Sequence, residues 1–122
     1  MPLPYGKWVT LAGCKIKLQP AGHILGSAFV EIKTGRGSQS HTVVFSGDLG
    51  APHTPLLPAP KSPYRADTLI MESTYGDKTH SGRRERMKTL QKKIESCFKN
   101  RGTILIPAFS IGRTQELLYE IE

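Results

Sequence analysis

The most restrictive stretch of this sequence is residues 43–50, VVFSGDLG, where a short apolar run meets a glycine and then an acid. The run contains β-branched residues and is bounded by glycine, which favours a buried strand over a helix. Gly47 permits a sharp turn. Asp48 then follows the end of the strand, where α/β-type folds usually place their functional residues. An aspartate in this position either caps a turn or binds a metal ion.

Two further polar residues occupy comparable positions. His23 follows the turn-forming residues 20–22, and Glu72 follows an apolar run at residues 67–71, which predicts another buried strand. Alone, such a histidine is usually structural and such a glutamate is usually a cap. Three such residues on successive strands can converge at one edge of a sheet. Imidazole and carboxylate together are ligands for zinc or a similar divalent ion.

The remaining apolar patterns predict both strands and helices, so we expect an α/β (α+β) fold. Alternation at residues 14–19 and 28–33 predicts two half-buried strands, with Glu31 and Lys33 facing outward. Residues 42–46 are expected to return antiparallel to the second strand, and residues 103–106 to form one more strand. Five prolines exclude a helix or central strand from residues 50–65, which we expect to lie as a loop across the body of the fold.

Two helices are predicted in the second half of the chain. Residues 83–100 carry apolar residues at helical spacing, with Ser81 as the N-cap and Gly102 as the C′ residue. Ser110 is expected to cap a last helix, in which the inner stripe is formed by Leu117, Leu118 and Ile121.

The charge of the chain favours polyanionic partners. Its 122 residues include 17 Lys and Arg against 10 Asp and Glu, which makes nucleic acid the first candidate and a merely basic soluble domain the alternative. Two isolated cysteines exclude a disulfide framework or a structural zinc site built on cysteine. No stretch is typical of a membrane span or a signal peptide, so we expect a cytoplasmic protein without a membrane partner. Phosphate contacts are expected from the basic residues of the first helix, Arg83, Arg84, Arg86, Lys88, Lys92 and Lys93.

Four segments, taken in order, resemble the β-CASP branch of the metallo-β-lactamase superfamily. They are residues 21–27 (AGHILGS), 45–50 (FSGDLG), 72–77 (ESTYGD) and 106–118 (IPAFSIGRTQELL). The resemblance implies that residues 1–76 form the C-terminal part of the first metallo-β-lactamase segment, a partial sandwich sheet. Residues 77–122 would then begin the α/β β-CASP insertion. Because members of this branch process nucleic acids, the resemblance implies a zinc-dependent phosphodiesterase that processes RNA by attack of a metal-activated water.

The resemblance also implies a role for each of the three polar residues. His23 matches a zinc ligand, and Asp48 matches the aspartate that bridges two zinc ions. Glu72 matches an acidic residue that orients a histidine from further along the chain, so Asp48 and Glu72 are the candidate catalytic residues. His41, His53 and His80 match no motif position and are expected at the surface.

The main zinc-binding motif of the family, His-x-His-x-Asp-His, does not occur in these 122 residues. The sequence therefore resembles an internal segment of a longer enzyme. Because two ligands hold zinc weakly, we expect the isolated chain to be inactive, and to form a homodimer through surfaces exposed by truncation. The alternative is a non-catalytic basic module that binds RNA or another single-stranded nucleic acid. A thiolesterase of the same superfamily is disfavoured by residues 72–76 and 113–116, which resemble the β-CASP insertion.

Overall fold

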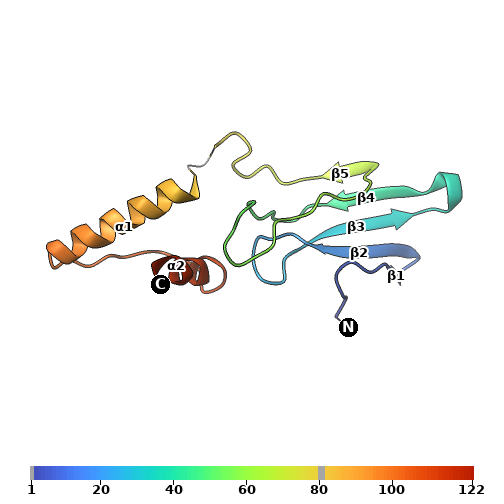
Figure 1. Cartoon of the computed structure of the whole chain (residues 1–122). Coiled ribbons are helices and arrows are strands. Elements are labelled where there is room, and N and C mark those ends of the chain that lie inside the picture. The colour runs from blue at the N-terminus through green and yellow to red at the C-terminus, as the bar shows by residue number, and fades with distance from the viewer. Residues whose placement is uncertain (1, 80–81) are drawn as a thin grey trace. The chain divides into compact units, whose positions relative to one another are not determined.

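The computed structural model describes residues 2–79 and 82–122. The chain divides into two compact units, Met1–Glu72 and Ser73–Glu122. The first unit contains the strands and the second contains two α-helices (Figure 1). The predicted α+β class is confirmed, because the fold combines a five-stranded mixed sheet with these helices. The predicted domain division after residue 76 stays a prediction.

The strands follow one another across the sheet in chain order (Figure 1). The first four strands pair antiparallel, which includes the antiparallel return predicted for residues 42–46. The fifth strand pairs parallel to the fourth. Parallel pairing needs a long crossover connection, which residues 46–67 provide. The elements are β1 (Val9–Leu11), β2 (Cys14–Pro20), β3 (Ala28–Thr34), the 3₁₀ helix η1 (Gly37–Gln39), β4 (His41–Phe45) and β5 (Thr68–Ile70).

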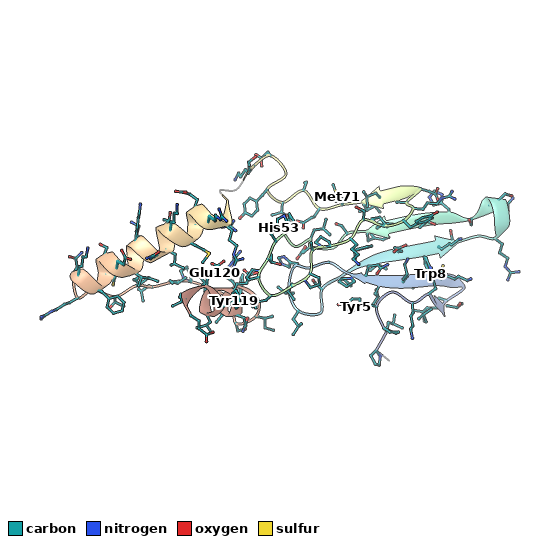
Figure 2. All side chains as sticks on the ribbon, in the orientation of Figure 1. Tyr5, Trp8, His53, Met71, Tyr119 and Glu120 are labelled. Carbon is teal, nitrogen blue, oxygen red and sulfur yellow. The ribbon has the colours of Figure 1, made fainter. Side chains whose placement is uncertain are left out.

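The small core of the first unit includes a buried charge. Phe29 and Val44 are 3% and 2% exposed, and Glu31, which was predicted to face outward, is also only 2% exposed. The register of β2 and β3 places Lys17 opposite Glu31, with Nζ 2.8 Å from Oε1. Nζ of Lys17 also lies 4.8 Å from the centroid of the ring of Trp8, which is labelled in Figure 2. The outward prediction for Glu31 is wrong because an ion pair across the strands compensates its burial.

The proline-rich residues 50–65 pack against the turn that follows β2. A Cβ atom on Gly22 would lie 2.5 Å from the carbonyl oxygen of Pro58, so the two backbones are in close contact. The prediction that residues 50–65 form neither helix nor strand is confirmed, and their course across the body of the fold stays a prediction. The predicted buried strand at residues 67–71 is shorter and more exposed, since Leu69 and Ile70 are 52% and 50% exposed on β5 at the edge of the sheet.

The second unit contains α1 (Arg83–Lys99), α2 (Arg113–Ile121), the segment that joins them and, before α1, residues 73–79 without helix or strand. Arg83 on α1 forms an ion pair with Glu120 on α2, with Nε 3.1 Å from Oε1; Glu120 is labelled in Figure 2. Among residues 2–79 and 82–122, no helix has both the length and the apolar composition needed to cross a membrane.

The ends of α1 differ in detail from the prediction. Ser81 and His80 lie outside the described residues, and the N-cap is Gly82. At the C-terminal end, the amide of Gly102 donates to the carbonyl of Cys97 (2.9 Å), and Arg101 has a φ of +50°. Arg101 therefore takes the left-handed C′ position that was predicted for Gly102, which follows it as C″ in a Schellman motif.

Three predictions for the last part of the chain are wrong. Residues 103–106 form no strand, and Leu105 is 88% exposed, because the described part of this unit offers them no strand to pair with. The N-cap of α2 is Gly112 rather than Ser110, and its amide donates to Oε1 of Gln115 (2.7 Å). The predicted inner stripe of α2 is also exposed in large part, since Leu118 is 65% exposed.

Candidate metal centre

A serine hydroxyl fixes the turn that carries His23. After β2 ends, the amide of Ala21 donates to the carbonyl of Ser27 (3.1 Å) and closes the loop. Inside it, the Ser27 hydroxyl accepts the amides of His23 (3.0 Å) and Ile24 (3.2 Å). The backbone around His23 is thus held by local hydrogen bonds, while its side chain remains 47% exposed.

A glycine in the left-handed conformation forms the turn that carries Asp48. After β4 ends at Phe45, Gly47 adopts a φ of +54°, which favours glycine over other residues. The hydroxyl of Ser46 donates to the carbonyl of Gly47 (2.7 Å) and supports the turn. The side chain of Asp48 is 76% exposed, so its carboxylate is accessible to a ligand.

Two glycines allow these turns to approach each other. The amide of Gly50 donates to the carbonyl of Ala21 (2.8 Å), and a Cβ atom on Gly50 would lie only 1.8 Å from the carbonyl oxygen of Gly22. A side chain at residue 50 would therefore force the turns apart. Because they are in contact, Nε2 of His23 lies 3.9 Å from Oδ2 of Asp48.

Glu72 contacts the same turn from the end of β5. Its amide donates to the hydroxyl of Ser46 (3.0 Å), and its carboxylate accepts the amide of Leu49, the residue next to Asp48. The three polar residues singled out in the sequence therefore gather at one end of the sheet. Their roles as ligands or catalytic groups remain predictions.

The pair of His23 and Asp48 fits part of a zinc site. Imidazole nitrogen and carboxylate oxygen are usual zinc ligands, so His23 Nε2 and Asp48 Oδ2, which lie 3.9 Å apart, are the atoms that would hold an ion. Within residues 2–79 and 82–122, no three His, Cys, Asp or Glu side chains are grouped so that they could hold a metal ion. A zinc site uses about four ligands, and the described residues supply two of them.

Asp67 anchors the other end of β5. Its carboxylate accepts hydrogen bonds from Arg65 (2.8 and 3.0 Å) and from the amide of Thr42 (2.8 Å), and its own amide donates to the carbonyl of Thr42 (2.8 Å). The Arg65 hydrogen bonds, followed by the one from Thr42, lower the pKa of Asp67 from its ordinary value. Because β5 has only three residues, these contacts help to set its register on β4 and hence the position of Glu72.

The predicted phosphate-binding residues lie on α1 and do not form one row. Helical spacing puts Arg84, Lys88 and Lys92 in line, four residues apart, whereas Arg86 and Lys93 lie on a different side of the helix. These five residues are exposed. Arg83 differs from them, because its guanidinium is paired with Glu120.

Sequence reasoning missed three residues that build the centre. Ser27 and Ser46 hold the two turns, and Gly50 permits their contact. The signal for Ser27 was its position four residues after His23, within reach of the turn amides. The importance of Gly50 could not be foreseen, because its contact partner, Gly22, is distant in the sequence.

Several known proteins are similar to this chain over almost its whole length, although no protein-family model matches it. Ribonuclease TTHA0252 from Thermus thermophilus is 41% identical over 118 residues, which are 97% of this chain and 26% of the ribonuclease. Transcription termination factor FttA from Methanothermobacter thermautotrophicus is 40% identical, over 98% of this chain and 19% of the factor. Integrator complex subunit 11 from Danio rerio is 39% identical, over 88% of this chain and 18% of the subunit.

The chain thus spans about a quarter or less of these relatives. Its four motifs occur in family order, and its three central polar residues gather at one end of the sheet. The similarity to the ribonuclease and to FttA covers these motifs together with the segments between them. The chain belongs to the β-CASP branch of the metallo-β-lactamase superfamily.

Proposed function

We propose that this chain is the part of a zinc-dependent, RNA-processing phosphodiesterase that supplies two metal ligands and one acidic positioning group. The observation that carries the proposal is the 3.9 Å separation of His23 Nε2 and Asp48 Oδ2. It is supported by the similarity to a ribonuclease and to transcription termination factors over nearly the whole chain. A bound zinc ion would supply Lewis-acid activation of the attacking water.

Each of the three residues has a distinct task in this proposal. His23 and Asp48 hold the metal, and the exposed carboxylate of Asp48 is free to contact a second ion as well. Glu72 orients a histidine that protonates the leaving oxygen, and this histidine belongs to the whole enzyme. The bond from Leu49 fixes the Glu72 carboxylate next to the Asp48 turn.

The isolated chain is expected to lack nuclease activity. Two ligands compete poorly with water for zinc, because a zinc site generally uses about four. Purified chain incubated with RNA and added zinc or manganese should therefore show no metal-dependent hydrolysis. Metal-dependent turnover by the 122-residue chain would contradict this part of the proposal.

A chimera tests whether the segment is catalytically competent within a whole enzyme. We would replace the matching 118-residue segment of the Thermus thermophilus ribonuclease by this chain. The chimera should hydrolyse RNA, and His23→Ala or Asp48→Asn should lower its rate at least about 100-fold, since even residues around metal ligands contribute about 10–100-fold. The control is His53→Ala, which changes an exposed histidine outside the site. Equal rates for Asp48→Asn and the control would refute the assignment.

A second candidate is a non-catalytic module that binds nucleic acid, favoured by the exposed cations of α1. Such a module would bind RNA without metal, and its affinity would fall steeply with salt. The two candidates are separated by hydrolysis in the chimera, because Asp48→Asn should leave RNA binding intact under both. A chimera that binds RNA but does not hydrolyse it before any substitution would support the module. In the chimera, loss of hydrolysis with retained RNA binding supports the enzyme.

A further inference from the structure

Ser46 occupies the point where the pairing of β4 and β5 ends. The last paired residues of these strands are Phe45 and Ile70. The amide of Ser46 donates to the carbonyl of Ile70 (2.9 Å), which extends the ladder by one bond. Beyond this bond, the hydroxyl of Ser46 accepts the amide of Glu72 (3.0 Å). A side chain therefore continues the contact between the two segments after the backbone ladder has stopped.

The same hydroxyl also supports the turn that carries Asp48. It donates to the carbonyl of Gly47 (2.7 Å), at the residue directly before Asp48. Ser46 is only 4% exposed, so water does not readily replace either bond. One buried oxygen is thus bonded to the backbone of both segments that carry an acidic site residue.

We propose that Ser46 is a positioning residue that fixes Glu72 against the Asp48 turn, by bonding the Glu72 amide and the Gly47 carbonyl with one hydroxyl. The bond from the Leu49 amide to the Glu72 carboxylate depends on this arrangement. The importance of Ser46 for catalysis rests on the proposed function. Its hydrogen bonds can be tested without any metal.

The test compares Ser46→Thr with Ser46→Val in the 122-residue chain. The two side chains have nearly the same shape, but only threonine retains the hydroxyl, so strain from the added methyl groups affects both variants. Amide hydrogen exchange is followed by NMR at Leu49 and Glu72. Val30 in the middle of β3 serves as the reference, because it pairs on both sides.

We expect the Leu49 and Glu72 amides to exchange about tenfold faster in the valine variant than in the threonine variant, as for loss of one partly buried hydrogen bond. The Val30 amide should exchange at similar rates in both. Equal rates at Leu49 and Glu72 in the two variants would overturn the proposal. A uniform acceleration at all three amides would also overturn it, because Ser46 would then contribute only to global stability.

If neither variant folds, hydrogen exchange in the unsubstituted chain tests the proposal. The Glu72 amide lies beyond the last ladder pair, so its protection is a measure of the bond to Ser46. Exchange at least about tenfold slower than in an unfolded peptide supports the proposal, and exchange at the unfolded rate overturns it. A zinc titration of the same samples separates the two ideas. If the unsubstituted chain shows no response to zinc while its Glu72 amide is protected from exchange, the proposed function is contradicted and the role of Ser46 still holds.

Discussion

The backbone amide of Leu49 donates to the carboxylate of Glu72, so the residue after Asp48 is bonded to the first residue of a different motif. The next residue, Gly50, contacts the turn that carries His23. The two residues after Asp48 therefore contact the carboxylate of Glu72 and the backbone of the turn that carries His23.

Gly50→Ala should open the contact between the two turns. A Cβ atom would lie 1.8 Å from the Gly22 carbonyl oxygen, so the backbone must move. We expect a loss of about 1–3 kcal/mol in the free energy of unfolding, as for other overpacked sites, measured by urea denaturation. The control is Gly102→Ala, where the nearest atom would be the Cys97 sulfur at 3.4 Å. Equal stability of Gly50→Ala and the unsubstituted chain would show that the contact is not tight.

Lys17→Met should destabilise the sheet unit by leaving Glu31 buried without its partner. Removal of one member of a buried ion pair costs about 3–5 kcal/mol, and the Glu31 side chain is 3% exposed beside Lys17. Replacing both residues, as in Lys17→Met with Glu31→Leu, should recover most of this loss. Lys15→Met, at an exposed position of the same strand, is the control. Chemical denaturation measures all three, and similar losses for Lys15→Met and Lys17→Met would contradict the pairing.

The stability of the sheet unit should depend on pH through Asp67. Its pKa is lowered in the folded chain, first by the hydrogen bonds from Arg65 and then by that from Thr42. A carboxylate of this kind stabilises the fold above its unfolded pKa of about 3.9, and the contribution is lost as pH falls through the lower folded value. The denaturant concentration at the midpoint of unfolding should therefore decrease as the pH is lowered below about 4. Asp67→Asn should be less stable at pH 7 and show a shallower fall in acid, and an unchanged acid profile would refute the role of Asp67.

Cations of α1 should contribute unequally to RNA binding. Arg84 is exposed, whereas Arg83 is paired with Glu120, so Arg84→Gln should weaken binding more than Arg83→Gln. The triple change of Arg84, Lys88 and Lys92 to Gln should reduce the slope of log affinity against log salt by about 2, at roughly 0.7 for each lost contact to a single strand. Fluorescence anisotropy with a labelled RNA at several salt concentrations measures both effects. An unchanged slope would exclude this row from the interface.

The sequence predicted elements well where local pattern and turn chemistry were sufficient. Alternation located the strand at residues 14–20, and helical spacing located α1 almost to its ends. The burial of Glu31 could not be foreseen, because it depends on the register that places Lys17 opposite it. Residues 103–106 have the apolar composition of a strand, but composition does not reveal whether a pairing partner is present.

The candidate site shows the same limit. Local motifs indicated His23, Asp48 and Glu72, and the resemblance gave each a role. Their approach to one another depends on Gly22, Gly50 and Ser46, whose contacts join segments that are far apart in the chain. Such contacts follow from the fold and leave no local pattern in the sequence.

The most direct test of the proposed metal centre is an NMR titration of the 122-residue chain with zinc. We predict saturable shifts at the His23 imidazole and at the amides of residues 47–49, with weak affinity, because two ligands are available. His41 and His53 should not respond in the same range, and His23→Ala or Asp48→Asn should each abolish the response. Shifts of equal size at His53, or an unchanged response in Asp48→Asn, would contradict a metal centre formed by His23 and Asp48.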